Sequence, residues 1–444
     1  MEINWFGLIF LVLISIIVGL KKSFRFVDAF VLIIPFNATV VFFVDESTAI
    51  NLPFAVLFFA SATYIVKNVL LRNPTIPKNF KNTLIWLLLI AIIAIVSEVM
   101  PFIINGDYMV LDRYGSGVYY AKDIPVYPSL QWITQLLYFL IGLFVVYLIS
   151  VTYTSIVGVK RLLKLLLSGI TFMIFWGWFG DLCVLLHIPY PYQLFNHLGM
   201  SKTGISILHG WPRMASVTME ASYFAQLLIP ITPFFYWFYQ EDKTFIFNKK
   251  YHSIMYIVAV ISSLIAYTTT GVIGFLLIIG LLLKNRIRFF NKASKYVLVL
   301  AYMALSAIAL IFISIYLVNV SDTYSGIERF KTVYLGFRYF LDYPILGLGW
   351  GVFPTYDLVI NLLVNFGIFG TLSFAIFLFN IFIRFVKKIK LKNKYQLLYK
   401  AGLESLLLIL IVSELSGFIY HSQYFWLYIG VVITISSLNL QKIT

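Results

Sequence analysis

Residues 357–383 read DLVINLLVNFGIFGTLSFAIFLFNIFI, and the first residue of this stretch is the only charged one. An apolar run of this length can cross the hydrocarbon core of a bilayer as a single helix, because each helical residue rises by about 1.5 Å. Similar runs recur along the chain, in which 61% of the 444 residues are hydrophobic and only 11% are charged. Backbone groups in lipid must pair within their own segment, and these unbroken runs lack the alternation of barrel strands. The sequence therefore predicts an all-α, polytopic integral membrane protein.

We predict a helical bundle of about 12–14 transmembrane helices in one integral membrane domain that covers residues 1–444. The longest segment between helices, residues 319–356, is predicted to be a large extracytoplasmic loop that carries amphipathic helices. The sequence shows no internal repeat of fixed period. The predicted helices cover residues 4–20, 26–44, 49–71, 83–105, 130–150, 163–187, 214–238, 253–268, 270–283, 296–318, 357–383, 401–420 and 424–439.

The chain carries a net charge of +15, and its basic residues are unevenly placed. About three quarters of the 33 Lys and Arg residues fall in alternate loops between the predicted helices, as the positive-inside rule describes for cytoplasmic loops. The basic loops therefore indicate orientation and contact with anionic lipid, and they do not indicate a nucleic-acid partner. These loops are 21–25, 72–82, 151–164, 239–252, 284–296, 384–400 and the C-terminal tail.

One pair of charged residues stands out at the start of the predicted helix 214–238, in the stretch WPRMASVTMEASYF. Pro212 suits the first turn of a helix, and Arg213 and Glu220 are seven residues apart, which places them on nearly the same face about 10 Å apart. Arg213 could then hold a phosphate group while Glu220 acts on a neighbouring hydroxyl. The alternative is an Arg213 that extends to lipid head groups and a Glu220 that is paired inside the bundle.

A second basic group lies in the long loop, where Arg329, Lys331 and Arg338 belong to a predicted amphipathic helix. Arg329 and Arg338 are half a turn out of phase, so they cannot both face one cavity, whereas Lys331 and Arg338 share a face. Either arginine suits a pyrophosphate, because a guanidinium forms bidentate bonds to phosphate oxygens. The alternative is a helix on the membrane surface with its basic residues at lipid phosphates.

The segment DYPILGLGWG, residues 342–351, ends that helix, and its glycines permit a tight turn. It is not a phosphate-binding P-loop, because it lacks a preceding strand and a following Lys-Ser/Thr pair. Tyr356 and Asp357 come next, at the mouth of the following helix. Asp357 could act as a general base for a sugar hydroxyl, or it could cap the helix start, and the residue pattern leaves both open.

Other polar residues carry weaker signals. Cys183 is the only cysteine, which excludes an internal disulfide and a thiolate metal site, and no His, Cys, Asp and Glu residues have metal-ligand spacing. The sequence YTTTG at residues 267–271 separates two short helices, which either expose helix ends at membrane depth or form a tight outer hairpin. Glu414 and His421 share a face, and we interpret His421 as an interfacial residue.

Three of these segments, in order, resemble the O-antigen polymerase and O-antigen ligase superfamily of membrane glycosyltransferases. They are PRMASVTMEASYFA, then YTTTGVIGFLL, and finally residues 329–370, in which an arginine precedes PILGLG and a helix that ends in NFGIFG. Two departures matter, because the family's second segment often carries an arginine where this chain has Thr269 and Thr270, and the ligase-type histidine falls at Tyr356 or Asp357. The missing histidine favours a polymerase over a ligase.

The resemblance implies a metal-independent glycosyltransferase without a cofactor, which acts on the outer face of a bacterial cytoplasmic membrane. It would polymerise lipid-linked repeat units of O-antigen, capsule or exopolysaccharide, transferring glycan with inversion from an undecaprenyl pyrophosphate donor to an acceptor sugar hydroxyl. The resemblance further implies partnership with membrane lipid, a flippase and a chain-length regulator. The alternatives are an O-antigen-type ligase and, from another class, a lipid-linked oligosaccharide flippase or transporter.

The same resemblance assigns roles to individual residues. Arg213 and Arg329 would bind the donor diphosphate, with Arg338 as a weaker third cation and Tyr356 beside them. Asp357 or Glu220 would accept the proton of the acceptor hydroxyl. These roles require the cations and carboxylates to meet at one end of the bundle.

Overall fold

The computed structural model describes residues 2–21, 23–43, 49–70, 80–112, 122–198, 204–205, 207–208, 211–241, 245–287, 324–391, 393–416 and 422–438. Most of these residues are helical, which confirms the predicted helical class. The predicted helix 296–318, residues 319–323 of the long loop, and His421 lie outside the described residues.

Most predicted helices occur where the apolar runs placed them. Within the described residues, five helices are long and apolar enough to cross a membrane: Lys81–Ile104, Leu130–Thr152, Ile156–Leu185, Leu358–Lys390 and Gln396–Leu415. The helices that match predictions are α1 (Trp5–Leu20), α3 (Leu52–Tyr64, extended by a π-helix over Ile65–Leu70), α4 (Lys81–Ser97), α5 (Met100–Ile104), α6 (Leu130–Thr152), α7 (Ile156–Leu185), α10 (Lys249–Ile265), α11 (Thr269–Ile287), α13 (Tyr324–Asp342), α14 (Leu358–Lys390), α15 (Gln396–Ser416) and α16 (Gln423–Ser437).

The predicted helix 26–44 is wrong in its second half. Helix α2 covers only Phe26–Ile33, and the chain then becomes extended in strand β2 (Val40–Phe43). This strand pairs with β1 (Glu2–Ile3) and β3 (Ala49–Asn51). The apolar composition of residues 34–44 could not distinguish a helix from a strand, because Val and Phe suit a buried strand as well as a membrane helix.

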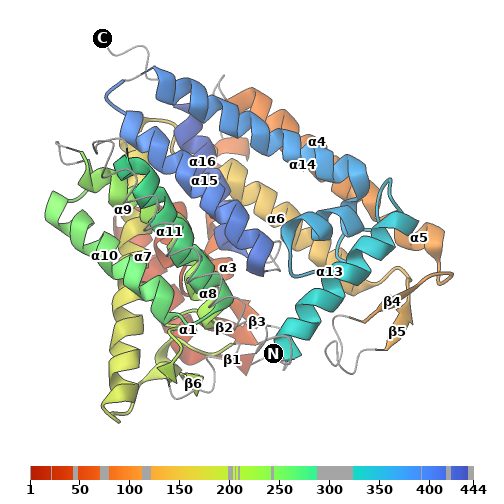
Figure 1. Ribbon diagram of the computed structural model, residues 1–444, viewed down its shortest axis with the longest axis horizontal. Coiled ribbons are helices and arrows are strands. Elements are labelled where there is room, and N and C mark those ends of the chain that lie inside the picture. The colour runs from red at the N-terminus through yellow and green to blue at the C-terminus, as the bar shows by residue number, and fades with distance from the viewer. Residues whose placement is uncertain are drawn as a thin grey trace.

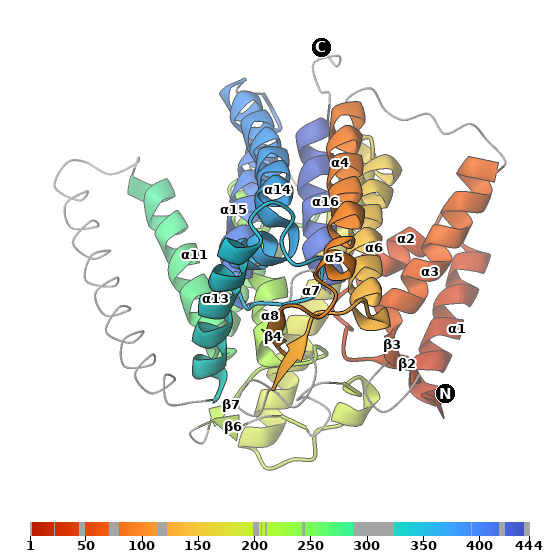
Figure 2. The same ribbon diagram turned by 90° about the vertical axis from the view of Figure 1, so that its right-hand side faces the viewer.

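Two further pairs of short strands correct the all-α expectation. Strand β4 (Met109–Leu111) pairs with β5 (Asp123–Pro125), and β6 (Ile207–Leu208) pairs with β7 (Trp211–Pro212). In Figure 2 the long helices run roughly alongside one another, and the labelled strands lie together at one end of the molecule. We call this the strand end. Helices α3, α14 and α16 finish at the opposite end.

Helix α16 forms the centre of the bundle. Every residue from Gln423 to Ser436 is buried, as expected for a helix that is surrounded on all sides. It packs against α6, α14 and α15, and α14 packs in turn against α4 and α13 (Figure 1). The site described below lies where α14, α15 and α16 meet α8 (Ala221–Leu228) and α13, toward the strand end.

A buried loop rich in glycine fixes the start of α14. Residues 347–355 are buried, and Gly347, Gly349 and Gly351 have positive φ angles of 70°, 108° and 80°. A Cβ atom on Gly347 would lie 2.4 Å from the carbonyl oxygen of Val364, so the loop approaches the α14 backbone too closely for any side chain. The glycines of this segment therefore serve close packing against α14 as well as the turn that the sequence predicted.

Helix α14 is interrupted opposite this loop. Gly367 has φ 63° and ψ −167°, a conformation that only glycine adopts readily, and it breaks the helix into two parts. The side chain of Asn365 in the first part accepts a hydrogen bond from the N–H of Phe353 (3.0 Å) and donates one to its carbonyl oxygen (3.0 Å). The first part of α14 and the loop are thus one packed unit that presents Tyr356 and Asp357.

Candidate functional site

Arg329 lies on the buried face of α13. Thr332, Gly336 and Tyr339 follow it at helical spacing and are buried, and α13 packs with this face against α14. Lys331 and Arg338 lie on the opposite face and are exposed. The structure therefore separates the two arginines as their spacing required, and only Arg329 faces the bundle.

The Arg329 guanidinium uses one of its nitrogens for a hydrogen bond within the protein, while another lacks a partner among the described residues. Its Nη1 donates a hydrogen bond to the carbonyl oxygen of Leu415 (2.9 Å), and its Cζ lies 5.6 Å from the centre of the Tyr356 ring. Its Nε is buried and has no hydrogen-bond partner among the described residues. A buried N–H without an acceptor is costly, so this donor is suited to an anionic ligand.

Asp357 begins α14 with one carboxylate oxygen occupied and one vacant. Oδ1 accepts a hydrogen bond from the N–H of Ile360 (2.5 Å), which is the helix cap that the sequence left open as an alternative. Oδ2 is buried without a hydrogen-bond partner in the described part of the chain. Burial raises the pKa of Asp357 to about 6, and the nearby Glu414 carboxylate adds to this effect. The cap and a proton-accepting role are thus compatible.

Glu414 occupies the same helix start from another element. It lies at the end of α15, and its Oε2 accepts hydrogen bonds from the N–H groups of Leu358 (3.2 Å) and Val359 (3.1 Å). These are the first two residues of α14, whose N–H groups have no partner within the helix. The sequence showed Glu414 only as a carboxylate in an apolar helix, and this placement against another helix could not be read from it.

Glu220 reaches the same cluster through Tyr223. Glu220 directly precedes α8, and its Oε1 accepts a hydrogen bond from the Ser222 hydroxyl (2.7 Å). Tyr223 lies within electrostatic range of both Glu220 and Tyr356, and its ring contacts that of Tyr424 on α16, with 6.0 Å between centroids. Tyr223 thus lies between the start of α8 and the Arg329–Tyr356 pair in electrostatic terms. Apart from its place near Glu220, nothing in the sequence marked Tyr223 as a site residue.

The predicted helix 214–238 begins seven residues late, which changes the position of Arg213. Pro212 belongs to strand β7, residues 213–220 are not helical, and Ser216 has a φ of 56°. Their polar groups bond to distant segments, since the N–H of Met219 donates to Asn37 Oδ1 (2.9 Å) and the Ser216 hydroxyl donates to the carbonyl oxygen of Met173 (2.5 Å). The shared helical face of Arg213 and Glu220 therefore does not exist.

Arg213 is half-buried beside β7, and its Nε has no hydrogen-bond partner within the described ranges of the chain. No interaction among the described residues joins it to Arg329 or to Glu220. The structure therefore brings Arg329 to Tyr356, which directly precedes Asp357, and leaves Arg213 and Arg338 apart from them. Glu220 relates to this group only through Tyr223, which lies within electrostatic range of both Glu220 and Tyr356. No group of three or more His, Cys, Asp or Glu side chains in the described part of the chain could hold a metal ion.

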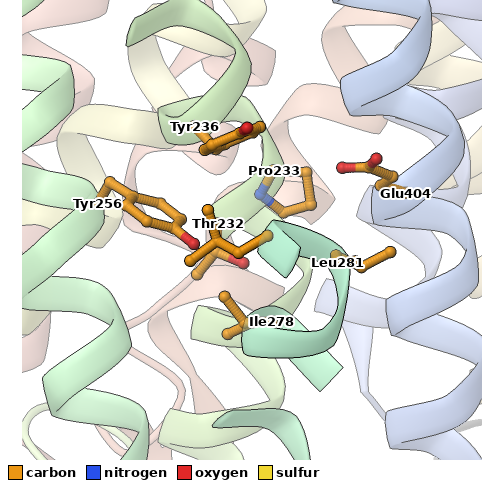
Figure 3. Close-up of a pocket in the computed structure, with 8 residues that line it drawn as sticks. Thr232, Pro233, Tyr236, Tyr256, Ile278, Leu281 and Glu404 are labelled. Carbon is orange, nitrogen blue, oxygen red and sulfur yellow. The ribbon is translucent and has the colours of Figure 1, made fainter. Parts of the chain in front are cut away.

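The chain also contains a pocket that no predicted site residue lines. It is a small, partly open pocket between helices α9 (Thr232–Tyr239), α10, α11 and α15. Figure 3 shows the hydroxyl-bearing side chains of Thr232, Tyr236 and Tyr256 with the Glu404 carboxylate at its edge, and the other lining residues are apolar. Trp237 Nε1 donates to Glu404 Oε2 (2.7 Å). Glu404 precedes Glu414 by ten residues of α15, or about 15 Å, so this pocket is separate from the Asp357 cluster.

No protein-family model matches the chain, and no curated protein matches it. The functional argument therefore rests on the residues and their geometry.

Proposed function

We propose that this protein is a membrane glycosyltransferase that polymerises lipid-linked oligosaccharide repeat units. The observation that supports it most is the placement of two vacant polar atoms at one helix start. Among the residues that the structure describes, Arg329 Nε and Asp357 Oδ2 are both buried without hydrogen-bond partners. Tyr356 relates them, because it precedes Asp357 and its ring lies beneath the Arg329 guanidinium. A cation beside a carboxylate is what diphosphate departure and hydroxyl deprotonation require.

The proposed reaction is a single displacement. The acceptor sugar hydroxyl forms a bond to the anomeric carbon of the donor glycan, and the bond from that carbon to the pyrophosphate oxygen breaks. Undecaprenyl pyrophosphate leaves with that bond's electron pair, and Arg329 stabilises its developing charge. Asp357 takes the hydroxyl proton. Tyr223 lies within electrostatic range of Tyr356 and of Glu220, and Glu220 and Tyr223 would bind hydroxyl groups of the acceptor sugar.

The proposal includes a location. The five long apolar helices suit a membrane protein, and the basic loops favour an outer position for the strand end in a bacterial cytoplasmic membrane. The donor's prenyl chain would then lie along the exposed apolar helices while its diphosphate reaches Arg329. The ligase alternative uses the same chemistry with a different acceptor.

The test is reconstitution of the purified protein in liposomes with lipid-linked repeat units isolated from the producing cells. Arg329→Ala is expected to lower the rate of chain elongation by about 100-fold, in line with the loss of one transition-state cation. Lys331→Ala, on the exposed face of the same helix, is the matched control and should retain elongation. Product length is followed by gel electrophoresis.

The outcomes separate the candidate functions. Longer lipid-linked chains support the polymerase, whereas transfer to an added acceptor lipid without elongation would identify a ligase. Movement of the repeat unit across the bilayer with no new glycosidic bond would identify a transporter. Equal elongation by Arg329→Ala and Lys331→Ala would remove Arg329 from the site.

A further inference from the structure

The end of α15 connects the cation of the cluster to its carboxylate. Leu415 accepts the hydrogen bond of Arg329 Nη1 (2.9 Å), and the preceding residue, Glu414, accepts those of the first two N–H groups of α14. Two consecutive residues of one helix therefore contact Arg329 and the first turn of α14, which Asp357 directly precedes. Any shift of this turn would change the position of Arg329 relative to the start of α14.

In the described part of the chain, one charged residue acts on Asp357 itself and two others lie near tyrosines of the cluster. Glu414 of α15 acts on Asp357 by its charge, Arg329 of α13 lies over the Tyr356 ring, and Glu220, which directly precedes α8, lies within electrostatic range of Tyr223. Glu414 is the one that both contacts the α14 backbone and acts on the Asp357 carboxylate by its charge. Glu414 is also exposed, although the surrounding residues of α15 are apolar. A charged residue in an apolar helix needs a reason, and packing in the protein interior does not supply one here.

We propose that Glu414 is a positioning residue, which holds the start of α14 so that the vacant oxygen of Asp357 faces the substrate beside Arg329. Its two hydrogen bonds fix the direction of the first turn of α14, and its negative charge keeps a second negative charge on Asp357 unfavourable until the pH rises. The assignment rests on the proposed function for the role of Asp357, but the contact itself does not.

Substitution by glutamine separates the two effects of Glu414. Glu414→Gln keeps an oxygen that accepts the N–H bonds of Leu358 and Val359 but removes the charge, and Glu414→Ala removes both. Glu404→Gln is the matched control, because it removes a carboxylate from the same helix at the separate pocket, where it bonds to Trp237. All three variants and the wild type are studied as the full chain in lipid nanodiscs.

The first measurement does not require activity. Difference infrared spectroscopy across a pH titration follows the carboxyl band of Asp357, which is identified by its loss in Asp357→Asn. We expect Glu414→Gln to move the midpoint of this band downward by at least about half a pH unit, because a like charge is removed. Glu404→Gln should leave it unchanged. An unchanged or raised midpoint in Glu414→Gln would overturn the proposal.

The second measurement is elongation in the liposome assay. Glu414→Gln should keep turnover within about tenfold of the wild type. Glu414→Ala should lower turnover by about 100-fold, because Asp357 is no longer held in position. The substrate concentration needed for half-maximal rate should change little in Glu414→Ala. Equal losses in both variants would overturn the positioning role. If the wild type elongates nothing, the proposed function fails, and the infrared midpoint still decides whether Glu414 acts on Asp357.

Discussion

Asn365→Ala tests whether one side chain holds the glycine-rich loop against α14. Asn365 is buried, and its Nδ2 donates to the carbonyl oxygens of Phe353 (3.0 Å) and Asn361 (2.9 Å) while its Oδ1 accepts from the N–H of Phe353 (3.0 Å). Alanine removes these hydrogen bonds, together with a longer one from Asn365 Nδ2 to Asn361 Oδ1 (3.5 Å). It also leaves the buried N–H and C=O of Phe353 without these partners, and each orphaned group costs about 1–3 kcal/mol. We expect Asn365→Ala to lower the free energy of unfolding by about 3–4 kcal/mol.

The assay is steric trapping of the protein in bicelles, which measures the free energy of unfolding without leaving a lipid environment. Asn380→Ala is the control, since Asn380 is half-buried further along the same helix and should cost less than about 1 kcal/mol. Because the loop carries Tyr356 and Asp357 at its end, Asn365→Ala should also reduce elongation. If Asn365→Ala costs no more than Asn380→Ala, the loop is held by other contacts and the reasoning is wrong.

Three further predictions use the same assays. Asp28 is fully buried and accepts hydrogen bonds from Arg161 Nη2 (2.7 Å) and the Tyr153 hydroxyl (2.6 Å), so Asp28→Asn should lower the free energy of unfolding by about 3–5 kcal/mol, and an unchanged value would contradict the network. Gly367→Ala should lower the free energy of unfolding by more than about 3 kcal/mol, because a φ of 63° is strained for alanine and the new Cβ would lie 2.2 Å from the Ile345 carbonyl oxygen. Gly19→Ala is the control and should be neutral or stabilising, because a Cβ there would meet nothing within 4 Å. Finally, a base must be deprotonated to act, so elongation should fall about tenfold per pH unit below the Asp357 pKa of about 6, and a rate that stays flat to pH 4 would exclude Asp357 as the base.

The sequence determined the class of this protein and the position of most helices. Apolar runs of more than about 20 residues that lack the alternation of strands favour helices, and residues 130–150 and 358–383 are helical apart from the break at Gly367. The sequence also determined that Arg329 and Arg338 lie on different faces of α13, because residues nine apart cannot share a helical face. The positive φ angles of the glycine-rich loop agree with the turn that its composition predicted.

Only the tertiary structure decided which charges meet. Apolar composition allows both a strand and a helix, so the chain after Ile33 and the residues before Ala221 took their conformations from partners far away in sequence. Because residues 213–220 are not helical, Arg213 does not share a helical face with Glu220. The packing of α15 against α14 places Glu414 at the start of α14. The physical reason is that buried backbone groups bond to whatever polar atoms surround them, and those atoms are positioned by the packing of the whole bundle.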